Sequence, residues 1–143
     1  MTTVEDAKIT GDAGSDFIGV IVDIDYSPRS ISADTAGKII DASSVPVVIL
    51  MESICSHILN VLSTVHPYGV QIAGDNPPDD IARLKETAGC AVWKTIHLTR
   101  ASGEKIPVPD LKALIDTYHH AGVDVVVLDS MVGNKKGGTG QGR

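Results

Sequence analysis

Arg29 and Asp129 are the two residues of this chain whose types and positions most directly suggest chemistry. Arg29 stands in a turn beside Pro28, after the apolar run at 17–22, and its guanidinium offers a planar fork suited to a carboxylate or a phosphate. Asp129 directly follows the apolar run at 123–128, where apolar surroundings favour a protonated carboxyl that can donate a proton near neutral pH. A solvated surface arginine and an aspartate that caps the next turn are the simpler interpretations.

Gln71 and Lys94 are polar residues inside short apolar segments, at 69–74 and 92–96. A polar residue there costs free energy unless it is paired or faces a site. We therefore take both as candidate substrate-binding residues, with Asp75 close to Gln71. Lys94 is the more informative of the two, although a lysine that extends from the sheet edge into solvent is an alternative.

A glycine cluster at 137–140 contains Gly137, Gly138 and Gly140. Its backbone amides could bind a phosphate, or the segment could fold over a substrate, so these glycines are candidate substrate-binding residues. The cluster is not a P-loop, because no Gly-Lys-Ser/Thr follows it, and it is not a dinucleotide-binding motif, because the Gly-x-Gly-x-x-Gly spacing is absent. A flexible segment is the alternative interpretation.

The cysteines and histidines do not predict a metal site or a cofactor. Cys55 and Cys90 lack the Cys-x-x-Cys spacing and are more often small buried hydrophobes than nucleophiles. Asp23 and Asp25 share one face of an extended segment, which is weak evidence for metal binding. No ligand spacing is found among the five histidines, which are His57, His66, His97, His119 and His120.

Strand-like and helix-like segments alternate and would position these residues. Continuous runs of branched apolar residues at 17–22, 45–51, 69–72, 91–96 and 123–128 predict five strands covered on both faces, as in parallel sheets. Helical periodicity or capping signals predict helices at 3–13, 31–43, 54–65, from 77 onward and at 110–121, with Ser32 as the expected N-cap of the second. The class is therefore α/β, with ligand sites beyond the carboxyl ends of the strands.

The composition fits one compact soluble domain spanning residues 1–143. Of the 143 residues, 43% are hydrophobic and 21% charged, and the net charge of −6 argues against a nucleic-acid partner. The chain begins with acids where a secretory signal carries bases, and no apolar run approaches the roughly 20 residues that cross a bilayer. We expect a cytoplasmic protein with no membrane partner.

Two architectures fit this alternation. A five-stranded doubly wound sheet suits the length, since a closed eight-stranded barrel normally needs about 200 residues or more. Strand order distinguishes them: 1-2-3-4-5 indicates a partial barrel, whereas 2-1-3-4-5 indicates the doubly wound sheet.

Taken in order, the segments resemble the phosphoribosylanthranilate isomerase family, whose fold is a (β/α)₈ barrel. The resemblance runs through residues 3–19, the arginine turn at 27–32, the segment at 69–75, the segment at 92–96, Leu128-Asp129 and the glycine cluster. Ala73 stands where many members carry histidine. The resemblance implies a partial TIM barrel with about five parallel strands and outer helices. This would be an incomplete domain, which lacks the family's strands one, seven and eight.

The resemblance also implies an activity in tryptophan biosynthesis: the Amadori rearrangement of N-(5-phosphoribosyl)anthranilate, a small phosphorylated substrate, without a cofactor. Asp129 would be the general acid and Arg29 would hold the anthranilate carboxylate. The family's base is a cysteine on the first strand, which neither Cys55 nor Cys90 matches, so the general base is unassigned. An incomplete barrel leaves open strand edges, which favours pairing with another chain, including a homodimer. A non-catalytic α/β binding or regulatory module and an inactive barrel fragment are the alternatives.

Overall fold

The computed structural model describes residues 1–100, 102–132 and 135–136. Gly137, Gly138 and Gly140 lie outside the described residues, so their predicted role is not tested. The helices are α1 (Val4–Asp12), α2 (Ala33–Ala42), α3 (Ser56–Val65), α4 (Pro78–Ala88) and α5 (Val108–His120). The strands are β1 (Ile18–Val22), β2 (Ser30–Ile31), β3 (Val47–Met51), β4 (Gly69–Ile72), β5 (Ala91–His97), β6 (Val125–Asp129), β7 (Met131–Val132) and β8 (Lys135–Lys136).

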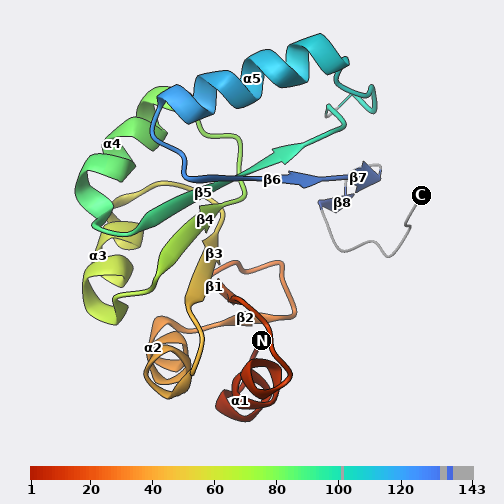
Figure 1. Cartoon of the computed structure of the whole chain (residues 1–143). Coiled ribbons are helices and arrows are strands. Elements are labelled where there is room, and N and C mark those ends of the chain that lie inside the picture. The colour runs from red at the N-terminus through yellow and green to blue at the C-terminus, as the bar shows by residue number, and fades with distance from the viewer. Residues whose placement is uncertain (101, 133–134, 137–143) are drawn as a thin grey trace.

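The main sheet is parallel throughout, and its order is β2-β1-β3-β4-β5-β6. The five expected strands therefore lie in sequential order, and only the two-residue β2 is placed outside β1. Each helix packs against the next one along the chain, and Figure 1 shows the helices following one another around one side of the strands. This arrangement confirms the partial barrel and contradicts the doubly wound alternative, which needs helices on both faces of the sheet.

Local sequence explains where the helices begin and end. The Thr3 hydroxyl caps α1 by accepting from the Asp6 amide at 3.1 Å, and Ser32 caps α2 by accepting from the Thr35 amide at 3.2 Å, as predicted. Pro78 occupies the first turn of α4, where its missing N–H costs nothing. Gly89 caps the C-terminus of that helix with a φ of 65°, a left-handed conformation that glycine adopts without steric cost.

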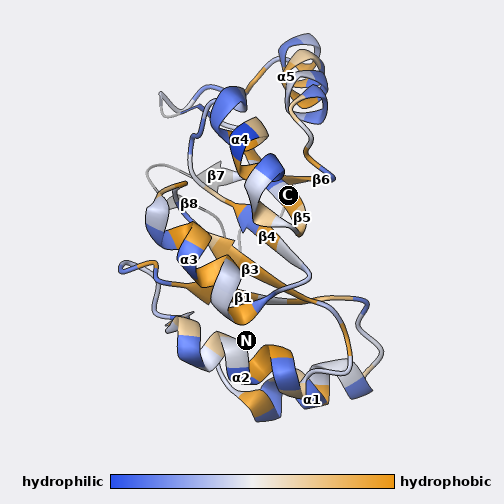
Figure 2. Cartoon of the chain, turned by 90° about the vertical axis from the view of Figure 1, so that its left-hand side faces the viewer, coloured by the Kyte–Doolittle hydropathy of each residue, from blue (hydrophilic) through white to orange (hydrophobic). Residues whose placement is uncertain are grey.

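The core lies between the sheet and the helix layer. Val20, Ile49, Val70 and Val92 are neighbours in register on four adjacent strands, and each has 0% exposed surface. Burying one such side chain stabilises the fold by about 1.5–3 kcal/mol. Figure 2 shows the apolar colour concentrated on these central strands, with mixed colours on the helices.

The opposite face of the sheet is less completely covered. Ile21, Leu50, Gln71 and Trp93 form a row in register on the same four strands, and none of them is completely buried. Because successive residues of a strand point to opposite faces, this face is the concave side of the partial barrel. Polar residues at its carboxyl end are therefore positioned to form a site.

Glycine is required at position 74, where the connection after β4 passes against the connection after β3. Its N–H donates to the Glu52 carbonyl at 2.9 Å, and a Cβ added at Gly74 would lie 2.3 Å from that same oxygen. Because the obstacle is backbone, Gly74→Ala is expected to lower the free energy of unfolding by about 2–3 kcal/mol, measured by urea denaturation. Gly19→Ala is the matched control, because a Cβ there would meet nothing within 4 Å. Equal effects of the two substitutions would contradict the explanation.

Asp124 directly precedes β6, and its carboxylate links α4 to β5. Its Oδ2 accepts from Lys85 Nζ and from the Val92 amide, both at 2.7 Å. Burial alone would raise the pKa of Asp124, but the hydrogen bonds from Lys85 and Val92 and the Lys85 charge outweigh burial and lower it. A lowered pKa means that the contact stabilises the fold above the unfolded-state value and is lost as the pH falls through the folded-state value.

Asp124→Asn is therefore expected to lower the free energy of unfolding at pH 7 by about 1 kcal/mol, a modest value because the pair is partly exposed. The difference from the unsubstituted chain should shrink below about pH 4. Urea denaturation between pH 3 and about pH 7 measures both effects. Asp34→Asn, which removes an exposed pair with Lys38, should cost less than about 0.5 kcal/mol. A difference that stays constant with pH would contradict the role of the Asp124 charge.

Candidate active site

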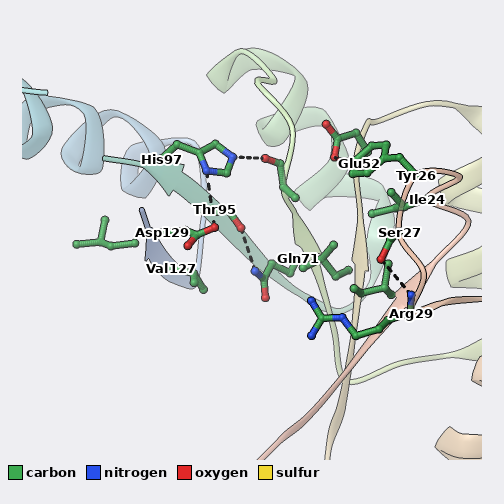
Figure 3. A pocket seen from close by; sticks show the side chains of 14 residues that line it. Ile24, Tyr26, Ser27, Arg29, Glu52, Gln71, Thr95, His97, Val127 and Asp129 are labelled. Atoms are coloured by element: carbon green, nitrogen blue, oxygen red, sulfur yellow. Dashed lines mark hydrogen bonds and ion pairs between the residues drawn. The ribbon is translucent and has the colours of Figure 1, made fainter. Parts of the chain in front are cut away.

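A cavity of about 300 Å³ opens on the concave face, at the carboxyl ends of the strands (Figure 3). Its walls come from β1, β3, β4, β5 and β6 and from the connections that follow the first three. The lining residues are Ile21, Ile24, Tyr26, Ser27, Arg29, Leu50, Glu52, Gln71, Ala73, Thr95, His97, Val127, Leu128 and Asp129.

The structure brings Arg29, Gln71 and Asp129 together on this cavity, three of the residues that the sequence singled out. Asp129 is the last residue of β6, and Gln71 lies on β4. Arg29 comes from the connection between β1 and β2, and Figure 3 shows it across the cavity from Asp129.

The turn that carries Arg29 is held by hydrogen bonds among its own residues. The Ser30 amide donates to the Ser27 carbonyl at 3.1 Å, and Ser30 Oγ accepts from the Ile24 amide at 2.9 Å. The Arg29 guanidinium itself has no ion-pair partner within the described ranges, and its side chain is exposed. A rigid turn therefore presents a free cation to the cavity.

Gln71 has one end fixed and one end free. Its Nε2 donates to Thr95 Oγ1 at 2.9 Å, which orients the amide. Among the described residues nothing donates to the Gln71 Oε1, which is therefore available as an acceptor.

Lys94 does not join the other candidates. It is 2% exposed, and its Nζ donates to the carbonyls of Gly74 at 2.8 Å and Thr95 at 2.6 Å, with the Tyr118 ring centroid 5.3 Å away. It lines a second cavity of about 310 Å³ and is absent from the first. The physical reason is strand alternation: Lys94 points to the helix side, opposite to Thr95. The alternative interpretation, a lysine that extends into solvent, is wrong, because the side chain is buried.

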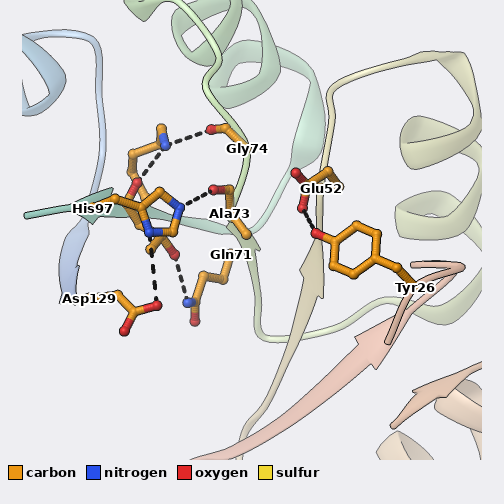
Figure 4. Close-up of polar contacts among 9 residues, drawn as sticks. Tyr26, Glu52, Gln71, Ala73, Gly74, His97 and Asp129 are labelled. Atoms are coloured by element: carbon orange, nitrogen blue, oxygen red, sulfur yellow. Dashed lines mark hydrogen bonds and ion pairs between the residues drawn. The ribbon is translucent and has the colours of Figure 1, made fainter. Parts of the chain in front are cut away.

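His97 is a site residue that the sequence did not reveal. It pairs in register with Asp129, and its Nδ1 lies 3.9 Å from Asp129 Oδ2 (Figure 4). Its Nε2 donates to the Ala73 carbonyl at 3.1 Å. The sequence does place His97 two residues after Thr95, so that the two side chains share one face of β5. To predict His97 as a site residue, however, one must know which face of the sheet is concave.

Tyr26 and Glu52 form a second polar pair in the cavity. The Tyr26 hydroxyl donates to Glu52 Oε2. Burial, followed by this hydrogen bond and the Glu52 charge, raises the pKa of Tyr26 to about 12. The phenol therefore stays protonated, and the pair joins the connections that follow β1 and β3.

Neither cysteine lines the cavity. Burial is the largest effect on the Cys90 thiol and raises its pKa, opposed by Lys85 and assisted by Asp124, so its thiolate is disfavoured. Cys55 is exposed at the start of α3.

The residues that the structure describes include no group of three metal-ligating side chains. Over the same residues, no helix has both the length and the apolar character to cross a membrane.

Sequential parallel strands, outer helices and a polar cavity at the carboxyl ends together define a (β/α)-barrel protein. The chain is 34% identical over 102 residues to N-(5'-phosphoribosyl)anthranilate isomerase of Methanocella arvoryzae, covering 68% of this chain and 47% of that protein. It is 31% identical over 144 residues to the enzyme of the same name from Natronomonas pharaonis, covering 98% and 62%. The chain belongs to the phosphoribosylanthranilate isomerase family, and it spans about half to three fifths of the length of these relatives.

The fold agrees with this assignment. The solved structure of N-(5'-phosphoribosyl)anthranilate isomerase from Pyrococcus furiosus superposes with a TM-score of 0.75 at 24% identity, covering 91% of this chain and 64% of that one. No protein-family model matches the chain. The expected partial barrel is thus confirmed by its own topology and by this likeness.

Proposed function

We propose that this chain carries the acid and the carboxylate-binding part of a phosphoribosylanthranilate isomerase site. The reaction is the Amadori rearrangement of N-(5-phosphoribosyl)anthranilate to 1-(2-carboxyphenylamino)-1-deoxyribulose 5-phosphate, in tryptophan biosynthesis. The observation that carries the proposal is that Arg29 and Asp129, 100 residues apart in the chain, line one cavity from opposite sides. The substrate has a carboxylate at one end and a furanose ring oxygen further along, and the cavity offers a partner for each.

Asp129 begins the chemistry. Its carboxyl gives a proton to the furanose ring oxygen, the bond from that oxygen to C1 breaks, and the nitrogen lone pair forms an iminium at C1. A base then removes the proton from C2, and the electron pair of that C–H bond forms the enamine that tautomerises to the ketose. The base is unassigned, because neither cysteine lines the cavity.

Arg29 and Gln71 bind rather than react. The free guanidinium of Arg29 pairs with the anthranilate carboxylate through two parallel hydrogen bonds. The Gln71 Oε1, oriented through Thr95, accepts from a sugar hydroxyl or from the bridging amine. Both contacts exist in the substrate and in the transition state, so they affect binding more than the chemical step.

Three measurements test this proposal. Titration calorimetry with the product should give saturable binding that is lost in Arg29→Ala, and a fluorescence assay should follow conversion of freshly made substrate. Genetic complementation of a tryptophan auxotroph that lacks this isomerase tests turnover in cells. Binding of the product without turnover would favour a non-catalytic binding module. The absence of both binding and turnover would contradict the proposal.

A further inference from the structure

His97 carries a buried nitrogen that the fold does not satisfy. Its side chain is only 10% exposed, and Nδ1 has no hydrogen-bond partner among the described residues. A buried polar atom without a partner costs about 1–3 kcal/mol, so such atoms usually have a functional reason. The Asp129 carboxylate faces it from the adjacent strand, with Oδ2 3.9 Å from Nδ1.

The other ring nitrogen determines what Nδ1 can do. The Ala73 carbonyl can only accept, so Nε2 must carry a proton to make its 3.1 Å hydrogen bond. In the neutral imidazole Nδ1 is then left with a lone pair that faces Asp129. The ring is therefore held in the tautomer that can take up a proton on the side of the acid.

Asp129 can reach this nitrogen by a small movement. Its side chain is 33% exposed, whereas the His97 ring is enclosed and anchored. The carboxyl torsion of aspartate is broad, and catalytic hydrogen bonds are often long in the absence of substrate. A shift of about 1 Å would turn the 3.9 Å approach into a hydrogen bond.

We propose that His97 is a positioning residue for Asp129 and that the two side chains share one proton. The inference rests on the proposed function, in which Asp129 is the acid. In the resting pair the proton lies on Nδ1 or on Oδ2. When Asp129 gives its proton to the sugar oxygen, the pair is left as a carboxylate and a neutral imidazole protonated on Nε2. Water returns one proton to the pair after the product leaves.

The consequence is that the proton which the acid delivers belongs to the pair and not to Asp129 alone. Other charged or titratable groups face this pair. Within the first cavity these are Arg29, Tyr26 and Glu52. Around the second cavity, which His97 also lines, they are Asp75, Lys94, Arg100 and Tyr118. The experiments therefore remove Asp129 or His97 individually and leave all of these in place.

The first experiment does not depend on turnover. In the full chain labelled with ¹⁵N-histidine, two-dimensional NMR should show the neutral His97 ring protonated on Nε2. The titration curve of the ring should contain a step shared with Asp129, and Asp129→Asn should remove that step. A neutral ring protonated on Nδ1, or an unchanged curve in Asp129→Asn, would overturn the inference.

The second experiment uses two variants that each keep one half of the imidazole. In His97→Gln the amide can still donate to the Ala73 carbonyl, and in His97→Asn a polar group remains near Asp129, but neither variant can store a proton. Both should move the alkaline limb of kcat/KM to lower pH by about one unit, with KM changed less than about twofold. Full recovery of the profile in His97→Asn would show that only a hydrogen bond is needed and would overturn proton sharing.

His57→Gln is the matched control. His57 also pairs with an aspartate, Asp23, at 2.6 Å, but the pair is exposed and lies outside both cavities. Its removal should leave the pH profile unchanged. If the unsubstituted chain shows neither binding nor turnover, the proposed function fails, and the NMR titration still decides whether His97 and Asp129 share a proton.

Discussion

Asp129→Asn should lower kcat by about 10³-fold while changing the affinity for the product by less than about twofold. The amide has nearly the shape of the carboxyl but cannot give a proton to the furanose oxygen. Ring opening would then depend on water as the acid. Stopped-flow fluorescence with freshly made substrate measures kcat, and calorimetry with the product measures binding.

Asp75→Asn provides the control for this result. Asp75 is the same residue type, three residues beyond the end of β4, but it lines the second cavity and not the first. Its replacement should change kcat by less than about threefold, since it is placed away from the reacting atoms. Comparable losses in the two variants, or full activity in Asp129→Asn, would remove Asp129 from the mechanism.

Arg29→Ala should raise KM by about 30-fold and leave kcat within about threefold of the starting value. Charge-assisted hydrogen bonds to a carboxylate contribute about 1.5–3 kcal/mol each, and those of Arg29 are present before and during the reaction. Steady-state kinetics over a wide substrate range measures the effect. Arg29→Lys should recover only part of it, because an ammonium cannot make the two parallel hydrogen bonds of a guanidinium.

The carboxylate role of Arg29 has a sharper test in a product analogue whose phenyl ring lacks the carboxylate. The protein with Arg29 intact should bind this analogue more weakly than the product, and Arg29→Ala should bind the two ligands equally. Arg83→Ala, on α4 and paired at the surface with Asp80, should bind both as the unsubstituted chain does. If Arg29→Ala weakened both ligands alike, its contact would lie elsewhere on the molecule.

The hydrophobic periodicity of the sequence was sufficient to predict the main strands and the helices. All five expected strands and five expected helices are present, and Ser32 caps α2 as expected. Boundaries moved by a few residues, because helix ends depend on caps and on packing. The two-residue β2 was not predicted, since it exists only through its register beside Ile21 and Val22. Length favoured the open doubly wound sheet, and the observed strand order overruled it.

The site was only partly visible in the sequence. Arg29 and Asp129 could be chosen because each follows an apolar strand, and parallel strands bring their carboxyl ends to one edge. Lys94 and His97 show where this reasoning stops. Both lie on β5, three residues apart, so alternation sends them to opposite faces. A continuously apolar strand does not reveal which face is concave.

The amino-acid sequence alone determined the α/β class, the alternation of elements and the two ends of the proposed site, because these depend on neighbours a few residues away. Only the tertiary structure decided that Lys94 belongs to the helix side, that His97 stands beside Asp129 and that Arg29 reaches the same cavity. Those outcomes depend on the register between strands distant in the chain, and many side chains along the whole sheet set that register together.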